Sequence, residues 1–177
     1  MKIWVFTPSN FSVLFGGVER SYLRVMLHRL VESGALVRAA RGVYVNPTAR
    51  NLPDDPREGL VPYLRPREFS YVSLESVLSP RSVISQISNA LTCMTTGSKG
   101  SFTTPWGEIQ FTHTQRELGD NLEADMVWND ESPIPTATVA RAYKDYELVR
   151  RRLDLIDDET LEDVLDEERQ MSHALHA

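Results

Sequence analysis

The hydrophobic and polar positions from residue 18 to residue 33 predict one amphipathic helix. At about 100° per residue, four apolar side chains fall on a single stripe that requires a core: Leu23, Met26, Leu27 and Leu30. The opposite face is mostly polar and cationic, with two arginines at its flanks: Ser21, Arg24, Val25, His28, Glu32, Arg20 and Arg29. The apolar stripe therefore packs inward, and the cationic face stays free for a partner.

A small hairpin is predicted directly after this helix. Gly34 suits the left-handed position at which helices end. Residues 35–39 and 43–45 suit two short strands, because the second is β-branched and aromatic. Arg41 and Gly42 supply the turn between them. The helix thus leads straight into an arginine-bearing hairpin.

A second, shorter helix is predicted upstream. Residues 9–15 suit this helix, and Gly16 with Gly17 suits the tight turn between two helices. The stretch MKIWVF at residues 1–6 looks more like a strand than a helix. Residues 1–48 are therefore expected to form a winged helix-turn-helix.

Double-stranded DNA is the partner that this outline predicts. A helix in the major groove contacts base edges with its N-terminal half, and arginine donates two hydrogen bonds to guanine. Wing arginines contact phosphates or the minor groove. The candidate DNA contacts are Arg20, Ser21, Arg24, His28, Arg38 and Arg41. The simpler alternative is a solvated, salt-bridged helix face packed on a hairpin.

The charge distribution separates the chain into two parts. Residues 1–50 hold seven Lys and Arg against two Glu, a net charge of +5. Because the whole chain carries −6, residues 51–177 carry −11. A cationic face on one part is enough to attract DNA, while the acidic remainder is repelled by it. This asymmetry predicts two functions in two parts of the chain.

Length and composition agree with an ordinary cytoplasmic protein. The chain has 177 residues, enough for one medium domain or two small ones, and 41% of them are hydrophobic. No stretch approaches the roughly 20 apolar residues of a membrane span, so no membrane contact is expected. The single cysteine, Cys93, is expected to be a small buried residue and excludes a cysteine-based zinc site. No cofactor or metal is predicted.

The fold class predicted for the whole chain is α+β. A proline-rich connector is expected over residues 49–68, followed by an α+β part over residues 69–177 with short strands and C-terminal helices. Ser73 is a candidate N-cap for a helical turn to Leu78. Strands are expected over residues 90–95, 101–104, 108–112 and 126–128.

Two helices are predicted near the C-terminus. From Thr138 an apolar face recurs at helical spacing, and that pattern places Arg141, Lys144 and Asp145 elsewhere on the helix. Residues 157–168 form an acidic helix with a narrow apolar seam. It is either a solvated terminal helix or a docking helix for a basic partner or a second copy.

Three blocks of sequence resemble, in the same order, the AbiEi-type antitoxins of abortive-infection, type IV toxin-antitoxin systems. The blocks are RLVESGALVRAARGVYV at 29–45, YVSLESVL at 71–78 and IPTATVARAYKD at 134–145. The resemblance implies a cytoplasmic antitoxin and autorepressor whose winged helix binds inverted repeats in its own promoter. It also implies neutralisation of a nucleotidyltransferase-like toxin encoded by the adjacent gene. A homodimer is a reasonable expectation, because paired half-sites multiply weak affinity.

An enzyme and a pure protein-interaction module are the other classes considered. His113, Cys93, Ser73 and Asp125 are residue types found in nucleophilic sites. Their spacing matches no nucleophile elbow, phosphate loop or metal-ligand motif, so no catalytic residue is predicted. An interaction module would use the winged helix to contact protein instead of DNA, and the sequence leaves that alternative open.

Overall fold

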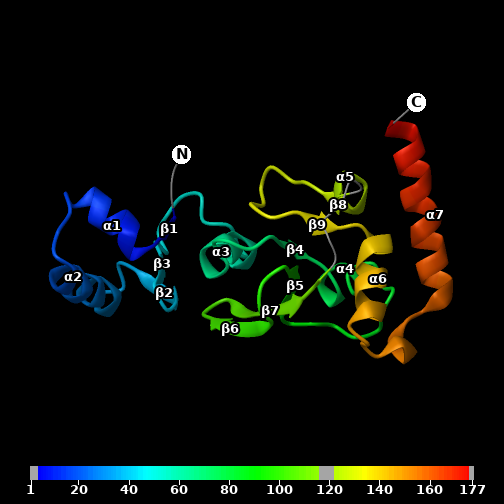
Figure 1. Cartoon of the computed structure of the whole chain (residues 1–177), viewed down its shortest axis with the longest axis horizontal. Helices are drawn as coiled ribbons and strands as arrows, with labels where there is room; N and C mark the ends of the chain where they lie inside the picture. Colours follow the sequence, from blue (N-terminus) through cyan, green and yellow to red (C-terminus); the bar gives the residue numbers. More distant parts are fainter. Residues whose placement is uncertain (1–3, 116–121, 176–177) are drawn as a thin grey trace.

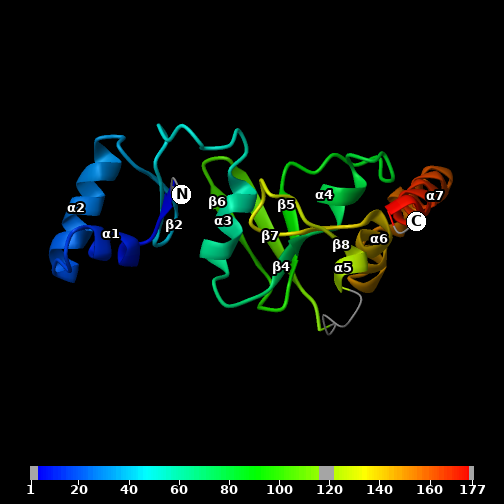
Figure 2. The ribbon, with the colours of Figure 1, turned by 90° about the horizontal axis from the view of Figure 1, so that it is seen from above.

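The computed structural model describes residues 4–115 and 122–175. Two sheets follow one another along the molecule, with three strands in the first and six in the second. Figure 1 shows the N-terminal helices at one end, the larger sheet in the middle and the last helix at the other end, and Figure 2 shows the same order from above. Within the described ranges, no helix has the length and apolar character needed to cross a membrane.

The N-terminal module has the topology that the sequence predicts. Its elements are β1 (Val5–Phe6), α1 (Pro8–Leu14), α2 (Arg20–Glu32), β2 (Val37–Ala40) and β3 (Val43–Val45). The strands form an antiparallel sheet in the order β1-β3-β2, and both helices lie between β1 and β2 in the chain. The expected helices, turn and hairpin are all confirmed.

Local chemistry fixes the turns of this module. Thr7 caps α1 in a capping box with Asn10, so the first orphan amides of the helix are satisfied. Gly16 and Gly17 have φ values of 67° and 79°, which L side chains rarely adopt. The turn between α1 and α2 therefore depends on this glycine pair, as the sequence indicates.

The three-stranded sheet packs against other elements on both of its faces. Along β3, Tyr44 points toward the helices and packs against a cluster made by Phe11, Leu23, Leu27 and Leu36. Its neighbours Val43 and Val45 point the other way and belong to the same core as the six-stranded sheet. The alternation of strand side chains thus attaches the hairpin to the rest of the molecule.

The second sheet is mixed. Its strands are β4 (Ser70–Val72), β5 (Leu91–Thr95), β6 (Gly100–Thr104), β7 (Gly107–His113), β8 (Met126–Val127) and β9 (Thr136–Ala137). They lie in the order β6-β7-β5-β4-β9-β8, and the pairs β5/β7 and β4/β9 are parallel. All five residues of β5 are buried. The sequence predicts β5 to β8 but misses β4 and β9, which pair with each other although they lie more than 60 residues apart in the chain.

Helices complete the α+β fold. They are α3 (Arg57–Leu64), α4 (Glu75–Leu78), α5 (Leu122–Asp125), α6 (Val139–Leu148) and α7 (Asp158–Leu175), with a 3₁₀ turn at Leu153–Leu155. The acidic helix runs further than the predicted end at residue 168. Glu168 on α7 accepts the backbone N–H groups of Val139 (2.7 Å) and Ala140 (3.2 Å), so α7 also caps the first turn of α6.

One sequence prediction is wrong in this region, and the burial of two residues of α6 was not predicted. Ser73 does not cap α4: Leu74, with a φ of 60°, occupies the N-cap position. The Ser73 hydroxyl instead donates to Asp145 Oδ2 at 3.0 Å. Asp145 and Arg141, predicted to lie away from the core face of α6, are both buried. Helical spacing correctly separates them from the apolar stripe, but α6 is covered on that side too.

Arg141 and Asp145 belong to a buried polar network around Tyr71. Asp145 accepts from the Tyr71 hydroxyl at 2.9 Å and from Arg141 Nε at 3.1 Å. Arg141 also donates to Asp125 Oδ2 at 2.8 Å and to the Tyr71 oxygen at 3.1 Å. Burial raises the pKa of Tyr71 far above its usual range, so the phenol stays protonated. The network joins β4, α5 and α6 through charge-assisted hydrogen bonds.

Candidate nucleic-acid interface

A groove lies between α2 and the β2–β3 hairpin. Its volume is about 960 Å³. All six residues predicted as DNA contacts line it: Arg20, Ser21, Arg24, His28, Arg38 and Arg41. The folded chain therefore gathers onto one concave surface the side chains that the sequence selected on two separate elements.

Helix α2 supplies the longer wall of the groove. Arg20, Arg24 and His28 are spaced four residues apart, so they follow one another along a single face. All three are exposed, while Leu23 and Leu27 are buried and anchor the helix to the sheet. Ser21 is also exposed, and its hydroxyl donates to Glu19 Oε1 at 2.7 Å. A free polar face thus results from burying the opposite stripe.

The hairpin supplies the second wall. Arg38 lies opposite Tyr44 in the β2–β3 register, and both side chains line the groove. Arg41 is exposed in the turn, next to Gly42 with a φ of 77°. The sequence assigned Tyr44 only to a strand; alternation along Val43, Tyr44 and Val45 is the signal that could have placed it on this face.

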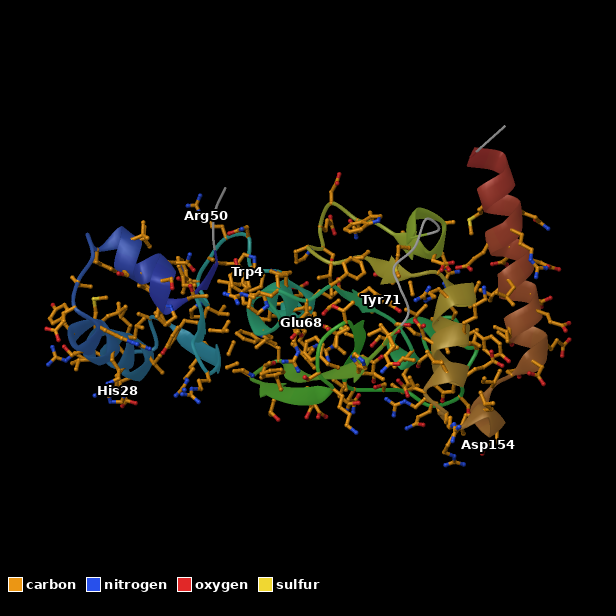
Figure 3. All side chains as sticks on the ribbon, in the orientation of Figure 1. Trp4, His28, Arg50, Glu68, Tyr71 and Asp154 are labelled. Atoms are coloured by element: carbon orange, nitrogen blue, oxygen red, sulfur yellow. The ribbon has the colours of Figure 1, made fainter. Side chains whose placement is uncertain are left out.

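The electrostatic character of the groove is cationic. Four arginines and one histidine line it, and no carboxylate does so within the described part of the chain. Not every basic residue of residues 1–50 is included: Arg29 and Arg50 are exposed outside the groove. Figure 3 shows Arg50 and His28 on opposite sides of the module. Most arginines of residues 1–50 therefore line the groove, and Arg29 and Arg50 lie outside it.

The four residues considered for nucleophilic chemistry have other contacts. Cys93 is fully buried in β5, and burial raises the pKa of its thiol, which disfavours the reactive thiolate. Ser73 and Asp125 are held by Asp145 and Arg141. His113 Nδ1 lies 2.7 Å from the Gly97 carbonyl oxygen. These contacts assign the four side chains to packing and hydrogen bonding within the fold.

Topology and groove together define the class of this module. A sheet in the order β1-β3-β2, two helices before the hairpin and a cationic groove beside the second helix make a winged helix-turn-helix. Residues 17–47 match the family model described as "Transcriptional regulator, AbiEi antitoxin". The matched segment contains α2, β2 and β3, and it confirms the resemblance seen in the first sequence block. No curated protein gives a significant match to the chain.

Proposed function

We propose that this protein is an autorepressor that binds double-stranded DNA in its own promoter. The convergence of Arg20, Arg24, His28, Arg38 and Arg41 on one groove of a winged helix carries the proposal. Helix α2 would enter the major groove, where Arg20 and Arg24 near its N-terminus can donate to guanine O6 and N7. The hairpin arginines would contact phosphates and fix the register. The family match over residues 17–47 supports a role in transcription.

The second half of the proposal is antitoxin activity in the cytoplasm. The matched family is described as an antitoxin, which supports neutralisation of a nucleotidyltransferase-like toxin encoded by the adjacent gene. The acidic residues 51–177 are repelled by DNA, so this activity is assigned to them. A homodimer is the form proposed to occupy paired half-sites.

A protein-interaction module is the second candidate. It is favoured by the exposure of apolar side chains around the turn between α1 and α2. Val13 is 83% exposed, Leu14 65% and Tyr22 61%. Exposed apolar patches of this kind often mark protein contacts. This candidate predicts a partner for the N-terminal module and no preference for promoter DNA.

A mobility-shift experiment with the full chain tests the repressor proposal. We expect the chain to bind the DNA upstream of its own gene about 10³-fold more tightly than a fragment of equal length with shuffled sequence. Higher salt should weaken both complexes, because phosphate contacts release counterions. Equal retardation of the two fragments would reject promoter recognition and favour the interaction module.

Co-expression tests the antitoxin half separately. Induction of the neighbouring gene alone should stop growth, and co-expression of this chain from an unrelated promoter should restore it. The unrelated promoter matters, because repression of the operon could otherwise mimic neutralisation. Failure to restore growth while promoter binding persists would leave a transcriptional regulator without antitoxin activity.

A further inference from the structure

A second groove lies where the N-terminal module meets the rest of the chain. Its volume is about 670 Å³. Three segments form its walls: the start of β1, residues 51–63 including α3, and residues 129–133 after β8. It shares no lining residue with the cationic groove. Figure 3 shows Trp4, at the second groove, beside α3 where the N-terminal module meets the rest of the chain, and His28, at the first groove, further out on that module.

Two aromatic side chains line this second groove. Trp4 and Tyr63 are each partly exposed there. The Trp4 indole lies against the backbone of α3 at Gly59, and a Cβ at that position would collide with the ring. Gly59 therefore lets the indole approach the helix backbone closely beside the groove. Flat aromatic faces of this kind attract guanidinium and ammonium groups.

The charge of the second groove is acidic. Four carboxylates line it, from Asp55, Glu58, Asp130 and Glu131, and no Lys, Arg or His in the described ranges does so. Asp55 is already held by Arg57 at 2.6 Å, which lowers the pKa of the Asp55 carboxyl. The other three form no ion pair with a described residue. Their charge is available to a ligand.

The acidic and aromatic lining of the second groove indicates which kind of ligand it can bind. Among the described residues, no group of three or more His, Cys, Asp or Glu is placed to hold a metal ion. Nucleic acid is excluded by charge. Carboxylates around two aromatic faces instead fit a cationic side chain, which gains both ion-pair and cation–π contacts.

We propose that this groove binds an arginine- or lysine-bearing segment of a protein partner. Trp128 extends the surface: it is 58% exposed and lines a neighbouring depression that shares Pro133 with the groove. Exposed tryptophans are frequent anchors of protein interfaces. The two grooves share no lining residue, so the partner and DNA would not compete for the same side chains. The proposal does not depend on DNA binding by the first groove.

Fluorescence anisotropy with a labelled six-residue peptide of alternating Arg and Gly tests the charge of the groove. The full chain should bind it, and a peptide of alternating Glu and Gly should not bind. The triple variant Glu58→Gln, Asp130→Asn, Glu131→Gln should weaken binding about tenfold. The matched control Glu162→Gln, Asp163→Asn, Glu167→Gln removes three charges from the exposed face of α7 and should change affinity less than about twofold. Equal weakening by both triple variants would overturn the proposal, because binding would then follow net charge alone.

The aromatic wall has its own test in the same assay. Trp4→Leu keeps an apolar side chain but removes the ring. We expect it to lower the affinity for the Arg-Gly peptide about fivefold. Trp106→Leu, in the β6–β7 turn outside the groove, is the control and should bind like the unchanged chain. Circular dichroism confirms that both variants are folded. Unchanged binding by folded Trp4→Leu would overturn the placement of the cation against the indole.

Discussion

Replacing Asp145 by alanine should lower the free energy of unfolding by about 3–5 kcal/mol. The Asp145 side chain is fully buried and accepts hydrogen bonds from Tyr71, Ser73 and Arg141. Its removal leaves the buried Arg141 with Asp125 as its remaining carboxylate partner in the network, and two hydroxyl donors lose their acceptor. Urea denaturation followed by circular dichroism measures the change directly.

The exposed pair Arg152–Asp154 provides the matched control. Its side chains are more than half exposed, so Asp154→Ala removes a carboxylate from a solvated ion pair and should lower the free energy of unfolding far less than Asp145→Ala does. The double variant Arg141→Met, Asp145→Leu should be more stable than Asp145→Ala, because it removes the buried Arg141 charge together with its buried Asp145 partner. Similar losses for Asp145→Ala and Asp154→Ala would contradict a stabilising role of the network.

The double variant Arg24→Ala, Arg41→Ala should bind promoter DNA about 100-fold more weakly than the unchanged chain. Arg24 and Arg41 lie on the two walls of the cationic groove, on α2 and on the hairpin turn. A base-contacting arginine contributes about 1–3 kcal/mol, and a phosphate-contacting arginine adds about 1 to the slope of affinity against salt. Both the affinity at one salt concentration and the slope over a salt series should therefore fall.

Arg50→Ala is the matched control for charge. It removes one positive charge from the cationic stretch of residues 1–50, but Arg50 is exposed outside the groove and lies on the side away from His28. It should change affinity less than about threefold. Equal weakening by Arg50→Ala and by either single variant, or full affinity of the double variant, would reject the groove as the DNA-binding surface. Thermal unfolding of each variant confirms that weaker binding is not a loss of fold.

The buried network and the cationic groove lie in separate parts of the molecule. The network around Tyr71 joins β4, α5 and α6, whereas the cationic groove lies on the N-terminal module. Asp145→Ala should therefore destabilise the protein without altering the salt dependence of DNA binding by the fraction that stays folded. The arginine variants should alter DNA binding without a comparable change in stability, because their side chains are exposed.

The N-terminal module is predictable from sequence because its signals are local. The spacing of Leu23 and Leu27, the pair Gly16–Gly17 and the short strand at Val43–Val45 each act within a few residues. Local signals of this kind specify their helices, turns and strands without depending on how the rest of the chain packs. The hairpin β6–β7 is predictable for the same reason, since its two strands are adjacent in the sequence.

Sequence-based prediction fails where contacts between residues far apart in the chain determine the structure. Ser73 looks like an N-cap, but it donates to Asp145, which lies 72 residues further along the chain. Arg141 and Asp145 look solvated because charged residues are seldom buried. They are buried because Tyr71, Ser73 and Asp125 satisfy their hydrogen bonds. The strands β4 and β9 exist because each pairs with a remote partner, which no local pattern records.

The sequence by itself therefore determined the winged module and the residue types of its cationic face, because helical and strand periodicity are properties of consecutive residues. Only the tertiary structure decided that six residues from two elements share one groove. It alone also decided that Trp4, Tyr63 and Glu131, which lie far apart in the sequence, line a second groove of opposite charge. Shared surfaces of this kind depend on how distant elements pack, and packing is set by contacts between residues that have no fixed spacing along the chain.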